Sequence, residues 1–315
     1  MRRVNPARER APERPVVALT VAVSTLDRPD ALARCLRSLL EGSALPDEIV
    51  VVDQAEDQRA EEVIAELGGS VRIEYVRDAA RGLGRSQNLA VSRARNDRVA
   101  VLDDDCVADA GWVATMARTL GEVDVAAGRV LPLGPDLPGL YAVASRTSGV
   151  RRDFDRAALP WDVGSGNNFA FARAWYERVG GCDERLGPGS RGRGAVDLDL
   201  FYRLARAGAR VRYEPDAVVY HERKPRSERL ERRIPYGYGM GACCTLWLRD
   251  GDRRGLGVLG RWVRMRGGML ARAAVRRRWL TAYEEALVLA GTARGIGYGL
   301  RVRSPGPTTA AGPQA

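Results

Sequence analysis

The amino-acid sequence predicts an α/β fold with a mostly parallel, Rossmann-like sheet flanked by helices and followed by a C-terminal helical extension. Short apolar runs alternate with segments whose apolar residues recur at helical spacing, as strands joined by crossover helices do. The first run, from Val16 to Ser24, is apolar without alternation, which a strand buried on both faces requires. The 315 residues, 45% of them hydrophobic, are enough to bury one large core or two modest ones.

The expected elements follow one another from this first strand. Pro29 suits a first helical turn, and apolar residues then recur at helical spacing until Gly42 ends the pattern. The elements expected next are a strand over 48–52, a helix over 57–67, a strand over 71–76, a helix over 83–94 and a strand over 98–102. Beyond them we expect a helix from about 109, short strands and loops over 123–172, a helix over 197–207, and two short strands over 209–213 and 217–220.

Composition divides the chain into four parts. Residues 1–14 and 303–315 are rich in Pro, Gly and polar residues, and we expect them to be disordered tails. Between them we expect an α/β domain over 15–222 and a basic helical extension over 223–302. The net charge of the chain is +10, whereas the segment from Arg223 to Arg278 alone holds 16 basic and 4 acidic residues. The positive charge is therefore concentrated in the extension.

Two interpretations of this basic extension stay open. Arginines interspersed with large apolar residues suit an interfacial helix on anionic lipid, and they also suit a lid or a homodimer surface. We expect no nucleic-acid partner, because no nucleic-acid-binding motif accompanies the charge.

The cellular location is predicted from absences in the sequence. The five cysteines show no CxxC spacing, no apolar run approaches 18 residues, and the N-terminal segment lacks a signal-peptide pattern. We expect a cytoplasmic protein, and peripheral contact with the inner face of the membrane stays open.

Polar residues follow the expected strands where each strand ends. Thr25 follows the first strand, Asp53 the second, and Asp103, Asp104 and Asp105 a later one. In an open parallel sheet, ligands bind beyond the carboxyl ends of the strands. Three consecutive carboxylates repel one another unless they are solvated, cap a helix or are neutralised by a cation, and Mg²⁺ or Mn²⁺ suits such a site. A solvated acidic turn stays open as the plain alternative.

Two further residues are candidates for chemistry. His221 is the only histidine and follows the last expected strand, so it is either a metal or diphosphate contact or an ordinary core or surface residue. Asp197 opens a predicted helix, which suits both an N-cap and a general base.

A glycine-containing loop adds a candidate phosphate contact. The segment from Arg81 to Ser86, RGLGRS, combines glycine for close backbone approach with arginine for charge. Its spacing differs from GxGxxG and from GxxxxGK[ST], and the chain has no GxSxG elbow. Dehydrogenases, P-loop enzymes and serine hydrolases are therefore disfavoured.

Taken together, these motifs resemble the inverting nucleotide-sugar glycosyltransferases of family 2, which have the GT-A fold. The matching segments, in order, are VAVSTLDRPDALARCLRSLL at 21–40, EIVVVDQAED at 48–57, RGLGRSQNLAV at 81–91, VLDDDCVADAGW at 101–112, GSGNNFAFAR at 164–173, GGCDERLG at 180–187 and VDLDLFYRLARAGARVRYEPDAVVYHER at 196–223.

The resemblance implies a role for each matching residue. The implied donor-nucleotide contacts are Thr25, Asp53, Arg81, Arg85 and Asp103. The implied metal ligands are Asp103, Asp105 and His221, of which Asp105 is the favoured direct ligand, and the implied acceptor contacts are Gly166, Asn167 and Asn168. Asp197 matches the catalytic base of a Glu-Asp motif. The Glu of that motif is Val196 here, so the class of acceptor stays open.

The resemblance implies transfer of a sugar from a nucleoside-diphosphate sugar to an acceptor hydroxyl, by in-line displacement with inversion and with help from Mg²⁺ or Mn²⁺. The acceptor is a glycan, a lipid-linked intermediate or a small natural product. Two alternatives remain. Val196 keeps a non-catalytic sugar-nucleotide or lipid-binding scaffold open, whereas a nucleotidyltransferase should carry a Gly-rich loop after the first strand, which residues 24–29 lack.

Overall fold

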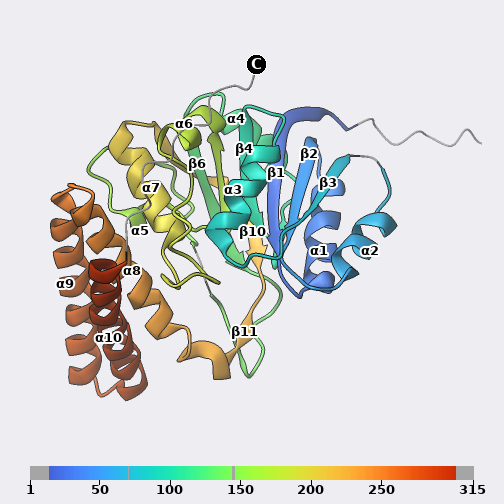
Figure 1. Ribbon diagram of the computed structural model, residues 1–315. Helices are drawn as coiled ribbons and strands as arrows, with labels where there is room; N and C mark the ends of the chain where they lie inside the picture. The colour runs from blue at the N-terminus through green and yellow to red at the C-terminus, as the bar shows by residue number, and fades with distance from the viewer. Residues whose placement is uncertain (1–13, 70, 144–145, 303–315) are drawn as a thin grey trace, which may run out of the picture. The chain divides into compact units, whose positions relative to one another are not determined.

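A computed structural model describes residues 14–69, 71–143 and 146–302 (Figure 1). The chain forms two compact units. Unit 1 is built from the described residues of Met1–Glu184 and Val196–Arg226, and unit 2 from those of Arg185–Ala195 and Ser227–Ala315. Apart from Arg14, the tails expected at 1–14 and 303–315 lie outside the described residues. The domain boundary expected at 222/223 stays a prediction.

Unit 1 contains a nine-stranded mixed sheet in the order β3-β2-β1-β4-β9-β6-β10-β5, with β8 also paired to β10. Its strands are β1 (Val16–Thr25), β2 (Leu45–Asp53), β3 (Arg72–Arg77), β4 (Arg98–Asp103), β5 (Cys106–Ala108), β6 (Val125–Pro132), β8 (Arg152–Phe154), β9 (Asn168–Ala172) and β10 (Val211–His221). Strands β3, β2, β1, β4, β6 and β10 point the same way, while β9, β5 and β8 run against them. The expected mostly parallel sheet is confirmed.

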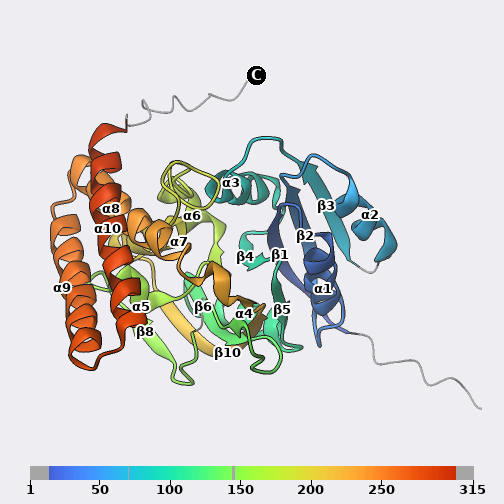
Figure 2. The same cartoon turned by 90° about the horizontal axis from the view of Figure 1, so that it is seen from below.

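Helices cover both faces of this sheet (Figure 2). They are α1 (Pro29–Leu40), α2 (Arg59–Glu66), α3 (Leu83–Arg93), α4 (Trp112–Thr119), α5 (Pro160–Val163), α6 (Arg173–Arg178) and α7 (Val196–Ala207). On one face α1 and α4 pack on β1, where Leu36, Trp112 and Val21 are fully buried in one apolar cluster. The opposite face of β1 meets α3, since Ser86 of α3 hydrogen-bonds to Ser24. Removing a side chain such as Leu36 from this core costs about 2 to 5 kcal/mol.

Three of the expected elements differ from the structure. The strands expected at 209–213 and 217–220 are one strand, β10, because the chain keeps its pairing with β6 on both sides of a register shift between Glu214 and Val218. Helix α4 begins at Trp112 instead of near 109, because Asp109 accepts a hydrogen bond from the Gly111 backbone as the chain turns. The short strand β5 was not expected.

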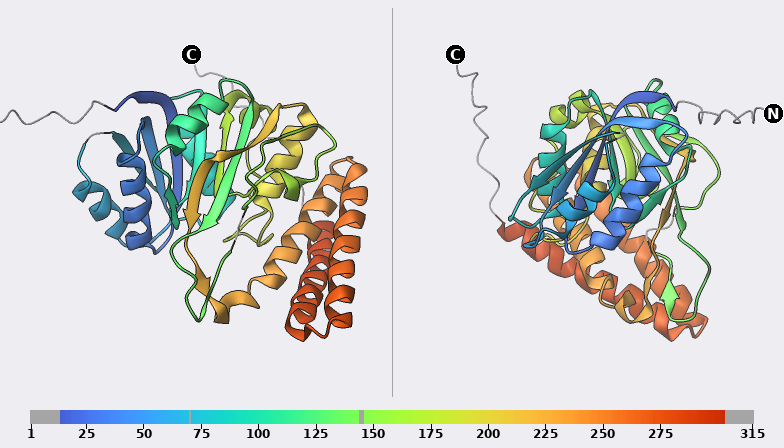
Figure 3. Two further views of the ribbon diagram at one scale, coloured as in Figure 1. Left: turned by 180° about the vertical axis from the view of Figure 1, so that it is seen from behind. Right: turned by 90° about the vertical axis from the view of Figure 1, so that its right-hand side faces the viewer.

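A two-stranded ribbon extends unit 1 beyond its main sheet (Figure 3). Strand β7 (Leu140–Tyr141) pairs antiparallel with β11 (Lys224–Pro225), which follows the end of β10 by only two residues. The ribbon therefore brings Lys224 back toward the end of β10.

Unit 2 is helical. It contains the short 3₁₀ helix η1 (Arg226–Arg229, which begins at the last residue of unit 1), α8 (Arg233–Arg249), α9 (Arg254–Val275) and α10 (Trp279–Arg301). Glycines allow α8 and α10 to approach closely: a Cβ on Gly237 would lie 1.9 Å from the carbonyl oxygen of Val288, and one on Gly295 would lie 2.0 Å from that of Tyr238. Any larger residue at these two positions would push the helices apart.

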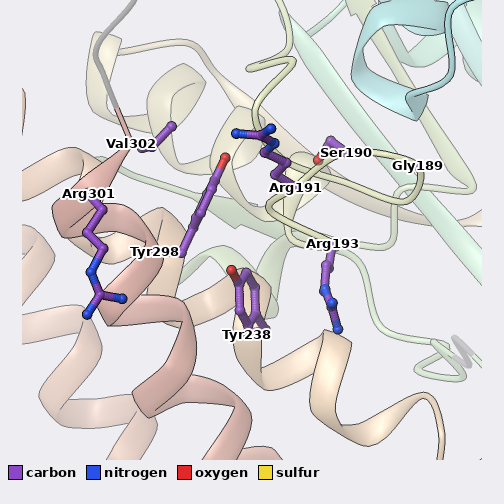
Figure 4. Close-up of a pocket in the computed structure, with 8 residues that line it drawn as sticks. All are labelled: Gly189, Ser190, Arg191, Arg193, Tyr238, Tyr298, Arg301 and Val302. Atoms are coloured by element: carbon purple, nitrogen blue, oxygen red, sulfur yellow. The ribbon is translucent and has the colours of Figure 1, made fainter.

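Unit 2 also contains a pocket of about 550 Å³ (Figure 4). Its lining comes from the loop 185–195, α8 and the end of α10: Gly189, Ser190, Arg191, Arg193, Tyr238, Tyr298, Arg301 and Val302. Arg193 stacks over Tyr238 at 5.4 Å. Over the described ranges, none of the helices combines the length and apolar character that a membrane crossing requires.

Candidate active site

Four residues singled out from the sequence end four strands of the unit 1 sheet. Thr25 is the last residue of β1, Asp53 of β2, Asp103 of β4 and His221 of β10. These strands point in the same direction, so their last residues meet at one edge of the sheet, where ligands of open α/β sheets bind.

The acidic turn after β4 is folded into this edge and is not solvated. Asp104, only 1% exposed, accepts a hydrogen bond from the Thr25 hydroxyl at 2.7 Å and pairs with Arg28 at 3.2 Å. Burial, partly offset by the charge of Arg28 and the Thr25 hydrogen bond, raises the pKa of Asp104 to about 6. Burial and the two neighbouring carboxylates, Asp105 and Asp104, also raise the pKa of Asp103 well above its usual range.

Asp105 is the most heavily paired carboxylate of the turn. One oxygen, Oδ1, lies 3.3 Å from His221 Nε2, and the other, Oδ2, lies 2.8 Å from both Arg28 and Lys224. Burial alone would raise its pKa, but hydrogen bonds from His221 and Lys224 and the charge of Lys224 hold it below the ordinary carboxyl value. Asp105 therefore stays ionised at neutral pH.

The donor set fits a divalent cation. Asp105 Oδ1 and His221 Nε2 are close enough to share one ion, and His221 Nδ1 has no hydrogen-bond partner among the described residues. Cys106 lies in the same group, but burial and nearby carboxylates raise the pKa of its thiol, so it is a poor ligand. One carboxylate and one imidazole suit an octahedral cation completed by diphosphate oxygens and water.

Lys224 and Arg28 were not singled out from the sequence. Lys224 is the only lysine in the chain and is mostly buried, with its ammonium also 3.1 Å from Glu222. A lone lysine among 49 arginines was the one signal available for it. Arg28 lies among the polar residues that follow the first expected strand, but its partners, 76 and 77 residues away, could not be predicted from the sequence.

Asp53 and the 80–82 loop are fixed by contacts within the fold. Asp53 is fully buried and accepts hydrogen bonds from the Ala55 backbone at 2.9 Å and the Tyr75 hydroxyl at 3.0 Å. Its neighbour Gln54 accepts from the Gly82 backbone at 3.1 Å and donates to the carbonyl of Ala80 at 2.5 Å. The end of β2 therefore holds the loop that precedes α3.

The two arginines of the RGLGRS segment differ in their partners. Arg81, in the loop, and Arg85, in the first turn of α3, are both exposed, but Arg85 forms an ion pair with Asp78 at 2.8 Å. The Asp78 pair holds Arg85 near its own loop, and no contact joins either arginine to the Asp104–Asp105 turn among the described residues.

Asp197 lies in the first turn of α7, close to the acidic turn. Its Oδ2 accepts a hydrogen bond from the Gly166 backbone at 3.0 Å, and its charge contributes to the raised pKa of Asp103. Burial, opposed by backbone hydrogen bonds from Leu198 and Gly166, raises the pKa of Asp197 itself. A Cβ on Gly166 would lie 2.7 Å from the Cβ of Asp197, so glycine permits this contact.

The residues after Gly166 have different surroundings. Asn167 is 3% exposed, yet neither end of its side-chain amide has a hydrogen-bond partner in the described structure. Asn168 accepts a hydrogen bond from the Trp112 indole and donates to the carbonyls of Arg129 and Ala217, all at 2.8 to 2.9 Å. Asn167 therefore has a buried amide without a described partner, while Asn168 joins β9 to its neighbours.

Val196, which stands where the resemblance implies Glu, is a packing residue. It is 2% exposed, and a Cβ on Gly84 would lie 3.2 Å from its Cγ2. An ionised side chain at 196 would be desolvated against α3, which explains why the local structure favours valine.

The chain matches the model of one protein family and is similar to several known proteins. The family model for glycosyl transferase family 2 matches residues 20–179, half of the chain. The chain is 25% identical over 274 residues to a chondroitin synthase of Escherichia coli, covering 70% of this chain and 39% of that protein. It is 24% identical over 221 residues to a glucosyl-dolichyl phosphate glucuronosyltransferase of Haloferax volcanii, covering 65% and 69% of the two chains.

Solved structures show the same fold. A mannosyltransferase from Pyrobaculum calidifontis, in complex with GDP-Man and Mn²⁺, superposes with a TM-score of 0.60 at 18% identity and covers 90% of this chain and 88% of its own. TarS of S. aureus in complex with UDP-GlcNAc gives a TM-score of 0.53 at 13% identity, covering 89% and 90%. The expected GT-A fold is confirmed, and the chain belongs to glycosyl transferase family 2.

Proposed function

We propose that this chain transfers a sugar from a nucleoside-diphosphate sugar to an acceptor hydroxyl with inversion at the anomeric carbon. The observation that carries the proposal is that Thr25, Asp105 and His221 lie together at one edge of the sheet. The charge of Asp197 also acts on Asp103 at this edge. A diphosphate leaving group and a proton-accepting carboxylate are the two requirements of a single in-line displacement.

The proposed divalent ion is held by Asp105 and His221, whose atoms lie 3.3 Å apart. When bound, such an ion stabilises the negative charge that develops on the diphosphate. The imidazole ligand favours Mn²⁺ over Mg²⁺, and Mn²⁺ accompanies GDP-Man in the mannosyltransferase structure. In this arrangement Asp103 and Asp104 position the turn and the nucleotide.

Arg28 and Lys224 are the proposed contacts of the diphosphate oxygens. Both now contact Asp105 Oδ2 at 2.8 Å. A metal on Asp105 would repel these cations, and the diphosphate supplies new anionic partners at the same place. The cluster therefore carries the positive charge that a diphosphate needs even before the donor arrives.

Asp197 is the proposed general base. The Gly166 backbone donates to its Oδ2 at 3.0 Å and orients the carboxylate, and burial raises its pKa toward the range of a useful base. Asn167, with its unpartnered amide, is the proposed contact of the acceptor beside this base.

The donor and acceptor are proposed only by chemical class. Related structures hold GDP-Man or UDP-GlcNAc, so the donor is a nucleoside-diphosphate sugar. The acceptor is a glycan, a lipid-linked intermediate or a small natural product. We propose that residues 15–222 form the catalytic domain and that the protein acts in the cytoplasm.

Donor binding tests the proposal most directly. Calorimetric titration of UDP-, GDP- and dTDP-sugars, with and without Mn²⁺, should find one donor whose binding requires the metal. Asp105→Asn should weaken that binding at least tenfold, whereas Asp97→Asn, which removes an exposed carboxylate paired with Arg173 in the same unit, should leave it within twofold. Equal binding by the Asp105 variant and the wild type would contradict the proposal.

A further inference from the structure

The turn between α9 and α10 exposes an unusual group of large apolar side chains. The solvent-exposed fractions are 84% for Val275, 68% for Trp279, 58% for Leu280 and 55% for Tyr283. These four residues lie within nine positions of the sequence, at the end of the hairpin that α9 and α10 form (Figure 2). Large apolar groups gathered in this way mark an interaction surface, whereas isolated ones do not.

The same turn is strongly basic. Residues 272–283 contain four arginines and no acidic residue, and the longer segment Arg253–Arg278, which includes all of α9, contains nine arginines and no acidic residue. Only Arg266 forms an ion pair with a residue that the structure describes, at 3.2 Å from Glu285. Arg276, Arg277 and Arg278 form the turn itself and are all exposed. These three arginines therefore form no ion pair within the described part of unit 2.

The local backbone holds the charged and apolar groups together. Two residues beyond the end of α9, Arg277 adopts the left-handed conformation at φ 55°, and the Arg278 backbone donates to the carbonyl of Ala273 at 2.8 Å. Helix α10 begins one residue later at Trp279. Val275 and Trp279 thus project from the two helix ends on either side of three arginines.

We propose that residues 272–283 dock unit 2 on an anionic lipid bilayer. Exposed aromatic and aliphatic side chains enter the boundary between headgroups and acyl chains, and the flanking arginines contact the lipid phosphates. The absence of acidic residues over 253–278 favours anionic lipid over a neutral surface. This inference is independent of the proposed reaction, because vesicle binding is measured without donor, metal or acceptor.

Vesicle co-sedimentation of the full chain tests this docking. The vesicles are phosphatidylcholine alone, or phosphatidylcholine with about 30% phosphatidylglycerol, which supplies the anionic surface. We expect binding to the anionic vesicles that weakens as salt is raised, and little binding to the neutral ones. Trp279→Ser/Leu280→Ser should lower the partition coefficient at least tenfold. Arg276→Gln/Arg277→Gln/Arg278→Gln should lower it by about fivefold per arginine.

The matched control is Leu137→Ser/Val150→Ser, which removes two side chains of comparable exposure, 50% and 73%, from unit 1. It should bind like the wild type. Circular dichroism of each variant excludes unfolding as the cause of lost binding. Wild-type binding no stronger to anionic than to neutral vesicles would overturn the proposal, as would unchanged binding by the Trp279/Leu280 variant. So would self-association of the wild type without vesicles that this variant abolishes, since the surface would then join two copies of the chain.

Discussion

At the carboxyl edge of the sheet in unit 1, Asp104 and Asp105 are buried and paired with cations, whereas at the α9–α10 turn of unit 2 the arginines are exposed and form no ion pair with a described residue. Asp104 and Asp105 together contact Arg28, Lys224 and His221. Eight of the nine arginines over 253–278 form no ion pair with any described residue.

This contrast separates two uses of charge. Buried, paired charges are costly to desolvate and are held in one geometry, so they suit a site that must receive a charged ligand without rearranging. Exposed, unpaired charges cost little and attract an external partner over several ångströms, with a strong dependence on salt. In these two proposals, the same arginine-rich composition serves the ligand site of one unit and the docking surface of the other.

The largest effect is expected at Asp197, the carboxylate that contacts none of the cations of the cluster. Asp197→Asn should lower kcat by about 10³-fold, because the amide cannot accept the acceptor's proton. Donor binding should remain within a few-fold of the wild type, since Asp197 contacts Gly166 and no cation of the cluster. Steady-state kinetics and donor titration measure both quantities. A kcat within tenfold of the wild type would assign the base to another residue.

The pH dependence of the same variant sharpens this test. Because the pKa of Asp197 is raised in the folded chain, its ionisation opposes folding as the pH rises through that pKa. At neutral pH, Asp197→Asn should therefore have a Tm above that of the wild type, and the difference should vanish below the ordinary Asp pKa of about 4. In the wild type, the acid limb of kcat should lie above the ordinary carboxyl value. Thermal denaturation of both proteins across pH measures this difference. A lower Tm for Asp197→Asn at neutral pH would show that the carboxylate stabilises the fold.

Lys224→Gln should change the affinities for Mn²⁺ and for the nucleotide in opposite directions. It removes a cation that lies 2.8 Å from Asp105, so Mn²⁺ should bind about fivefold more tightly in the absence of donor. The nucleotide, which loses a diphosphate partner, should bind about tenfold more weakly. Electron paramagnetic resonance of free Mn²⁺ and donor titration measure the two changes. Arg118→Gln, which removes an exposed arginine of α4, is the control, and parallel changes in both affinities would argue against competition between Lys224 and the metal.

Unit 2 has its own paired charges, and removing one should cost stability. Glu284 is 2% exposed and pairs with Arg229 and with Arg233, the latter at 3.2 Å. Glu284→Gln should lower the free energy of unfolding by about 1 to 2 kcal/mol. This is less than for a fully buried ion pair, because the two arginines are partly exposed. Urea denaturation measures it. Glu231→Gln, which removes an exposed carboxylate from the same unit, is the control and should change stability by less than about 0.5 kcal/mol.

The smallest expected effect is at the unpaired turn. Arg277 has the left-handed φ of 55°, which glycine adopts without strain. Arg277→Gly should therefore leave stability unchanged or raise it by up to about 1 kcal/mol, while vesicle binding falls by about fivefold. Urea denaturation and co-sedimentation give the two values. A clear loss of stability would show that the Arg277 side chain serves the fold.

Local sequence patterns located most of the first half of unit 1. The predicted helix from Pro29 and the strands at 48–52 and 98–102 match α1, β2 and β4 within a few residues, because apolar periodicity and Pro or Gly at the boundaries act over short distances. The polar residues that follow parallel strands also pointed to Thr25, Asp105 and His221 at one edge of the sheet, because the carboxyl ends of such strands lie together. The bulge that joins β10 into one strand gave no comparable signal.

The sequence by itself determined the fold class, the family and the concentration of arginine over 223–278, since each depends on patterns along the chain. Only the tertiary structure paired Arg28 and Lys224 with Asp105, assigned the loop 185–195 to unit 2 and left Asn167 without a partner among the described residues. These features depend on contacts between residues far apart in the chain. Hydrophobic periodicity specifies which face of an element is buried, but the partner of a buried charge is decided only when the elements pack.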